Sequence, residues 1–146
     1  MTSFAKGDET AKKCVPCSSM DTSALLSWDD VNQQLQSSPR LALWKQEMIG
    51  SDDDKSIPSL CCRFTAKNFQ AAMDSLNAIG VIAEREQHHP NFHLTNYRDV
   101  QIDIYTHKLS GITSNDIELA KMISEEVAVA YSPQWFKNHP EALSSS

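Results

Sequence analysis

Four of the five histidines of this 146-residue chain lie between residues 88 and 107, at His88, His89, His93 and His107. Imidazole is the side chain that can give or take a proton near neutral pH without special tuning. Pro90 disfavours helical geometry at His89, so the His88-His89 pair is expected in an extended turn. His107 falls at the end of a predicted strand, on its polar face. Because rigid scaffolds present reactive groups on turns and strand ends, the cluster predicts a proton-transfer site in a polar cleft.

Two other interpretations of the histidines stay open at this point. A histidine on a protein surface is often only hydrogen-bonded to its neighbours. A metal site is the second alternative, because imidazole is a common metal ligand. His89 and His93 are four residues apart, but Pro90 prevents the helical pair typical of metalloproteases, and the chain has no H-E-x-x-H motif. The sequence therefore assigns no metal and no cofactor.

The four cysteines are interpreted as free thiols. Cys14 and Cys17 form a C-x-x-C motif, but nothing around it predicts the strand and helix of a redox site. A zinc site would also need a second ligand pair. Cys61 and Cys62 are neighbours in a predicted strand, so they point to opposite faces and are expected to be buried or half-buried.

The elements that must position the histidines follow from the hydrophobic periodicity. Alternating apolar residues predict strands at residues 43–49, 60–65, 92–97 and 100–107. Apolar residues at three- and four-residue steps predict three helices, which begin at the capping residues Ser27, Thr65 and Thr113. Their predicted ends are Pro39, about Glu84, and Pro133. Asp116 lies three residues after Thr113, which predicts a capping box at the start of the last helix.

This order of elements is helix, two strands, helix, two strands, helix. It predicts an α+β fold, in which helices pack on one face of a four-stranded antiparallel sheet. We expect one domain over residues 22–132, preceded by a disordered tail at 1–21 and followed by a C-terminal tail at 133–146 in which Trp135 and Phe136 dock locally. The run from Gly50 to Lys55, with Asp52, Asp53 and Asp54, is interpreted as a solvated hairpin loop.

Composition and charge exclude several classes of function. The formal charge is -6, and 40% of the residues are hydrophobic. That charge argues against nucleic-acid or anionic-membrane partners, which attract basic surfaces. No apolar run approaches the roughly 20 residues of a membrane span. The polar first 21 residues do not resemble a secretory signal, so we expect a cytoplasmic protein without disulfides.

A longer motif passes through the histidine cluster. It reads Glu84-x-x-x-His88-His89-Pro90, then six residues to Tyr97, nine more to His107 and eight more to Asp116. This pattern of 33 residues resembles the signature of the pterin-4a-carbinolamine dehydratases, and the likeness in element order covers roughly residues 25–131. Some animal members also serve as a dimerisation cofactor of a homeodomain transcription factor. The segment from Asn91 to Leu94 is more similar to the plant and protist branch.

The resemblance implies a hydro-lyase that removes water from a 4a-hydroxytetrahydropterin during tetrahydrobiopterin recycling. It implies catalysis by His88, His89 and His107 without a cofactor, and a homodimer or homotetramer. The pterin would be bound by Glu84, His88, His89, Pro90, Thr106, His107, Lys108 and Leu109. Glu84 is expected to orient an imidazole or contact the ring, and Asp116 to support His107. The alternative is a non-catalytic dimerisation cofactor or binding protein on the same fold.

Overall fold

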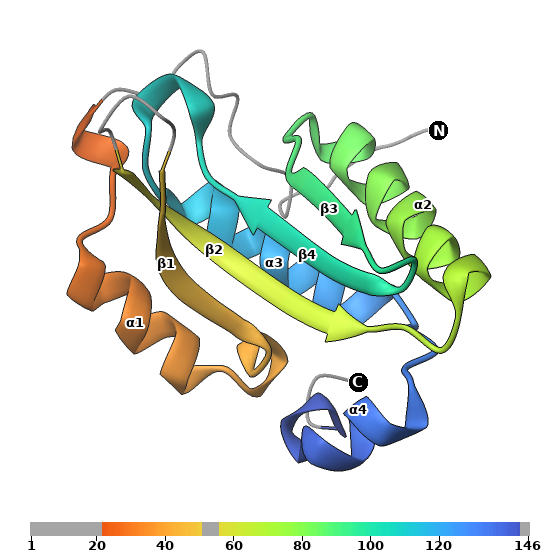
Figure 1. Cartoon of the computed structure of the whole chain (residues 1–146). Helices are drawn as coiled ribbons and strands as arrows, with labels where there is room; N and C mark the ends of the chain where they lie inside the picture. Colours follow the sequence, from red (N-terminus) through yellow and green to blue (C-terminus); the bar gives the residue numbers. More distant parts are fainter. Residues whose placement is uncertain (1–21, 51–55, 144–146) are drawn as a thin grey trace, which may run out of the picture.

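The computed structural model describes residues 22–50 and 56–143. Four strands form one antiparallel sheet in the order β1-β2-β4-β3, namely β1 (Trp44–Gly50), β2 (Ser56–Thr65), β4 (Asp99–Ile104) and β3 (Asn91–Thr95). The longer helices are α1 (Trp28–Ser37), α2 (Phe69–Glu86) and α3 (Ser114–Glu126). In Figure 1, α3 crosses behind the sheet, α2 lies beside β3 and α1 beside β1. The predicted α+β fold is therefore confirmed.

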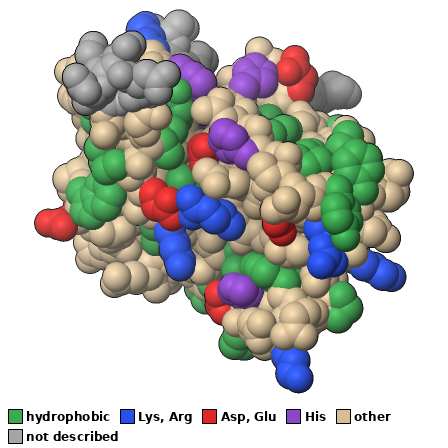
Figure 2. Space-filling model, viewed as in Figure 1, with side chains coloured by type: hydrophobic (Ala, Val, Ile, Leu, Met, Phe, Trp, Pro, Cys, Tyr) green, Lys and Arg blue, Asp and Glu red, His purple; other side chains and the backbone are tan. Residues whose placement is uncertain are grey.

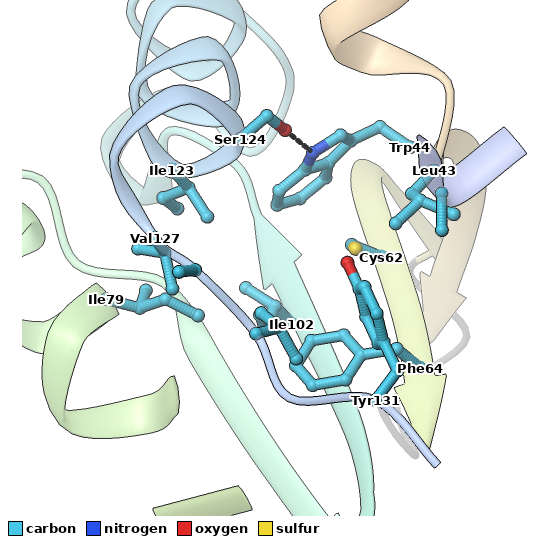
Figure 3. Close-up of a pocket in the computed structure, with 13 residues that line it drawn as sticks. Leu43, Trp44, Cys62, Phe64, Ile79, Ile102, Ile123, Ser124, Val127 and Tyr131 are labelled. Atoms are coloured by element: carbon cyan, nitrogen blue, oxygen red, sulfur yellow. Dashed lines mark hydrogen bonds between the residues drawn. The ribbon is translucent and has the colours of Figure 1, made fainter. Parts of the chain in front are cut away.

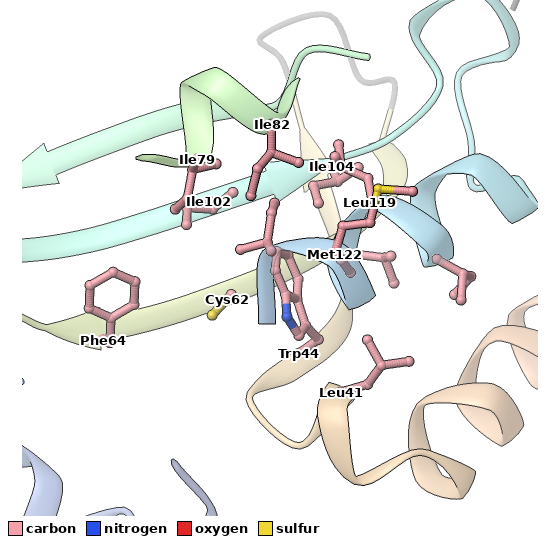
Figure 4. Close-up of a cluster of buried hydrophobic side chains, with 14 of the residues drawn as sticks. Leu41, Trp44, Cys62, Phe64, Ile79, Ile82, Ile102, Ile104, Leu119 and Met122 are labelled. Carbon is pink, nitrogen blue, oxygen red and sulfur yellow. The ribbon is translucent and has the colours of Figure 1, made fainter. Parts of the chain in front are cut away.

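One face of the sheet carries the core. Alternate residues of β2 and β4 point toward the helices and are buried, including Cys62, Phe64, Ile102 and Ile104. Figure 4 shows them packed with Ile79 and Ile82 of α2, with Leu119 and Met122 of α3, and with Trp44 at the start of β1 and Leu41 just before it. The opposite face is polar, as the alternation predicts. On the helix-facing side, the exposed fraction is 2% or less for each residue that was predicted to share this face, namely Val100, Ile102, Ile104 and Thr106.

Two of the predicted helix starts are confirmed. Ser27 Oγ accepts from the Asp30 amide at 3.1 Å and caps α1. Thr113 caps α3 through the predicted capping box with Asp116. The predicted start of α2 at Thr65 is wrong, because Thr65 ends β2 and Asn68 caps the helix instead, with its Oδ1 accepting from Ala71 N at 2.8 Å.

The last helix ends earlier than predicted. α3 stops at Glu126, and its C-cap Val127 is extended, with φ of -100° and ψ of 120°. The following residues run alongside the end of β2, where Tyr131 forms a bridge with Ala66. Pairing with the sheet therefore replaces the helical hydrogen bonds that the sequence pattern suggested up to Ser132.

The chain closes with a short aromatic segment, which contains α4 (Pro133–Asn138) and the 3-10 turn η6 (Pro140–Leu143). Trp135 stacks on Tyr131 at 4.9 Å and on His139 at 4.1 Å between ring centroids. Phe136 also stacks on Tyr131. The local docking of Trp135 and Phe136 is thus seen in the structure. Residues 1–21, with Cys14 and Cys17, and residues 51–55, with the three aspartates of the predicted loop, lie outside the described residues. Over the described residues, no helix is both long and apolar enough to span a bilayer.

The two strand cysteines are free thiols, and both are buried. Burial raises the pKa of Cys61 to about 12, and the neighbouring Asp103 carboxylate contributes to this rise. Burial also raises the pKa of Cys62 to about 12. The reactive thiolate is therefore scarce in both side chains at neutral pH.

We expect iodoacetamide at pH 8 to modify Cys61 and Cys62 far more slowly in the folded protein than in urea. Burial keeps the reagent away from the sulfur atoms, and the raised pKa lowers the fraction of reactive thiolate. Peptide mapping by mass spectrometry, with the urea-unfolded chain as the control, measures each site separately. Equal labelling rates in the two states would contradict the burial of these thiols.

Candidate active site

The C-terminal end of α2 places His88 and His89. Gln87 ends the helix in the left-handed conformation, with φ of 56°, and its amide donates to the carbonyls of Ala83 and Glu84. The His88 amide then donates to Ala83 O at 3.0 Å. A left-handed residue at this position is a common helix ending. It turns the chain sharply, so that the two histidines leave the helix before β3 begins.

An ion pair fixes the last turn of α2 against α3. The Arg85 guanidinium donates to both carboxylate oxygens of Glu126 at 2.9 Å. These hydrogen bonds lower the pKa of Glu126. The pair is partly exposed, so its contribution to stability is small, but it joins the two helices that carry the site.

His88 is buried, with 5% of its surface exposed. Its Nε2 lies 2.5 Å from Oδ1 of Asp116, which is completely buried. The carboxylate accepts from several donors, so the imidazole proton is assigned to Nε2, and a neutral ring then carries its lone pair on Nδ1. The sequence predicted that His88 lies in a polar cleft and that Asp116 supports His107. The structure instead buries His88 and pairs it with Asp116.

The second oxygen of Asp116 holds the start of α3. Oδ2 accepts from the Thr113 amide at 2.7 Å and from the Thr106 hydroxyl at 2.9 Å. The Thr106 and Thr113 hydroxyls also lie 2.9 Å apart. One carboxylate therefore caps a helix and fixes a histidine. The sequence pattern revealed the cap, but not the histidine, because 28 residues separate the two partners.

His89 and Glu84 lie at the protein surface. His89 Nε2 is 2.9 Å from Glu84 Oε1, and their side chains are 61% and 75% exposed. Glu84 thus contacts an imidazole, as predicted, and the partner is His89. Their exposure leaves both groups accessible to a ligand.

His107 begins the 3-10 turn η5 (His107–Leu109), so it lies just beyond β4 and not inside the strand predicted over 100–107. Its Nε2 lies 3.4 Å from the carbonyl oxygen of His89. Its ring stacks on Tyr105 with 4.4 Å between centroids. The contact brings His107 against the turn that contains His88 and His89.

The remaining predicted binding residues surround this group. Pro90 and Leu109 are half-buried, and Lys108 is exposed. Thr106 is completely buried, and its amide donates to Gly111 O at 2.8 Å. Its hydroxyl is bound to Asp116, so Thr106 positions the carboxylate and is enclosed by protein on all sides.

His93 lies apart from the other three. It belongs to the polar face of the sheet, where its Nε2 is 2.9 Å from Asp103 Oδ2. Arg63 on the same face donates to both carboxylate oxygens of Glu47. Figure 2 views the molecule from this side and shows acidic, basic and histidine side chains gathered on it. In residues 22–50 and 56–143, no three His, Cys, Asp or Glu side chains are grouped to hold a metal ion.

Known proteins resemble this chain in sequence. The sequence model of the family described as pterin 4 alpha carbinolamine dehydratase matches residues 24–126. The chain is 35% identical over 118 residues to the mitochondrial pterin-4-alpha-carbinolamine dehydratase 2 of Arabidopsis thaliana, which covers 81% of this chain and 58% of that protein. It is 37% identical over 109 residues to a putative pterin-4-alpha-carbinolamine dehydratase of Chlorobaculum tepidum, covering 75% and 88%.

The fold also occurs in a solved structure. The crystal structure of a transcriptional coactivator/pterin dehydratase from Brucella melitensis superposes with a TM-score of 0.54 and 23% identity, over 68% of this chain and 94% of that chain. This likeness concerns the fold alone. The Arabidopsis relative agrees with the predicted similarity to the plant branch. With a family match that extends over most of its length, the chain belongs to the pterin-4a-carbinolamine dehydratases, a family of hydro-lyases.

Proposed function

We propose that this chain removes water from a 4a-hydroxytetrahydropterin to give quinonoid dihydropterin, with His88, His89 and His107 as its catalytic residues. The contact of 3.4 Å between His107 Nε2 and the His89 carbonyl carries the proposal. It joins the turn after α2, which contains His89, to the turn after β4, which contains His107, 18 residues further along the chain. Family membership supports the reaction, and the histidine roles are our inference.

The reaction needs two proton movements. The 4a-hydroxyl leaves as water after it is protonated, and the neighbouring ring nitrogen loses its proton as the new double bond forms. No electrons are gained or lost overall. Positioned groups with a pKa near neutrality perform such transfers, and each contributes about 10²–10⁴-fold to the rate.

The surroundings of each histidine support different roles. We assign the proton exchange with the hydroxyl to His88 and His107. Asp116 would stabilise the imidazolium form of His88, as a carboxylate does in other catalytic histidine pairs. His89, with Glu84, would bind and orient the pterin. Pro90, Lys108 and Leu109 would line the same site.

The test is the dehydration of freshly prepared 4a-hydroxytetrahydropterin, followed by absorbance with and without protein. We expect faster formation of the quinonoid product when the protein is present. EDTA should leave this rate unchanged, because the proposed proton transfers need no metal. Loss of activity in EDTA that zinc restores would contradict the proposed mechanism.

The assembly and location of the chain are further parts of this proposal. We propose a homodimer or homotetramer, because unpaired edge strands need covering. Exposed Phe69 and Val81 on α2 and Phe92 on edge strand β3 support self-association. Light scattering coupled to size exclusion gives the mass in solution. The proposed cytoplasmic location is tested by microscopy of the tagged full chain, with organelle markers.

A further inference from the structure

A second concave site lies between α3, the sheet and the segment that follows α3. It is a pocket of about 190 Å³ beside Trp44, Cys62 and Ile102 (Figure 3). None of the three site histidines lines it. Protein interiors are packed as densely as organic crystals, so a space of this size within a small core is uncommon. It is a candidate binding site separate from the histidines.

One wall of the pocket is built by residues beyond the family match. That match ends at residue 126, whereas Val127, Val129, Tyr131 and Ala142 all line the pocket. Hydrogen bonds fix this wall on the sheet. Lys67 N donates to Ala130 O at 2.8 Å, and the amide of Ser132 donates to the carbonyl of Thr65 at 2.9 Å. One wall of the pocket is therefore formed by residues outside the family match, and the other walls by residues inside it.

The lining favours an uncharged ligand. Among the described residues that line the pocket, none is Asp, Glu, Lys, Arg or His. A charged ligand would lose its hydration without an ionic partner, which is costly. Four of the lining residues, Trp44, Cys62, Ser124 and Tyr131, nevertheless carry a polar group. The Tyr131 hydroxyl points inward beside the Cys62 sulfur, and Ser124 Oγ accepts from Trp44 Nε1 at 3.0 Å (Figure 3). Ligand sites typically combine such an apolar lining with a few polar groups.

We propose that this pocket binds a small uncharged phenol, with its ring among the apolar side chains and its hydroxyl at Ser124 or Tyr131. The volume of the pocket suits a single aromatic ring, because a dry engineered cavity of about 150 Å³ in another protein holds benzene. The present pocket of about 190 Å³ has room for that ring with one small substituent. This inference does not depend on the dehydratase activity.

Phenol itself is the probe, and the indole N–H signals of the ¹⁵N-labelled full chain are the readout. Trp44 Nε1 lies at the pocket, whereas Trp28 is 42% exposed on α1 and serves as the internal reference. We expect phenol to shift the Trp44 signal saturably, with a Kd of about 1 mM or lower, and to leave the Trp28 signal in place. Benzoate should bind at least about 10-fold more weakly, because it is charged at pH 7.

Two variants test whether phenol binds in this pocket, because each places a larger side chain in the space from a different position. Val127→Phe and Ala142→Leu should each weaken phenol binding by about 10-fold or more, since they occupy the space of the ring. Ala130→Leu is the matched control, because Ala130 is an exposed residue of the same segment and does not line the pocket. The proposal is overturned if wild-type protein shows no saturable Trp44 shift up to about 10 mM phenol. Undiminished binding in a folded filled variant, or benzoate binding equal to phenol, would overturn it as well.

Discussion

His88→Gln is expected to lower the rate of catalysed dehydration by about 10²-fold or more while the protein stays folded. The glutamine amide can still donate to Asp116 from the place of His88 Nε2, but it cannot exchange a proton near neutral pH. Glutamine is preferable to alanine here because His88 is buried. Alanine would leave the buried Asp116 carboxylate without its imidazole partner.

The matched control is His93→Gln. His93 is also hydrogen-bonded to a carboxylate, that of Asp103, but it lies on the polar face of the sheet. This variant should retain nearly native turnover. Circular dichroism and the thermal midpoint show whether each variant is folded. Near-native turnover of folded His88→Gln would remove His88 from the proton-transfer step.

Asp116→Ala is expected to lower the free energy of unfolding by several kcal/mol, because each buried donor left without an acceptor costs about 1–3 kcal/mol. The substitution leaves the amide of Thr113, the hydroxyl of Thr106 and the ring of His88 without their shared acceptor. Urea denaturation followed by fluorescence measures the change.

Asp30→Ala provides the comparison for Asp116→Ala. Asp30 is also the third residue of its helix, but it lies at the exposed start of α1. A helix-end carboxylate at an exposed site contributes about 0.3–1 kcal/mol, so this variant should be little destabilised. If the two variants were equally stable, Asp116 would act only as an ordinary helix cap.

The comparison of sequence and structure separates local from long-range information. The caps at Ser27 and Thr113 were predictable, because each depends on residues three positions apart. The buried face of β4, with Val100, Ile102 and Ile104, was predictable as well, because side chains alternate between the two faces along a strand. The gathering of His88, His89 and His107 was expected from the family signature, since no local rule brings segments 18 residues apart together.

The errors occur where tertiary contacts override a local pattern. The apolar spacing through Val127 and Ala130 favours a helix, but the chain there pairs with the end of β2 near Ala66. The partner of His88 was missed because Asp116 was expected to cap the helix and to support His107 instead. A buried carboxylate that accepts hydrogen bonds on both oxygens can serve two purposes, and the spacing of residues along the chain reveals only one of them.

The most direct measurement is the rate of 4a-hydroxytetrahydropterin dehydration by the double variant His88→Gln, His107→Ala, compared with wild type and His93→Gln. If the two histidines share the proton transfer, the double variant should be close to the uncatalysed rate. The fold-reduction in rate of the double variant should also be smaller than the product of the fold-reductions of the two single variants, because the residues act as a unit. A folded double variant that still dehydrates the pterin at near-native rate would contradict the assignment of the active site.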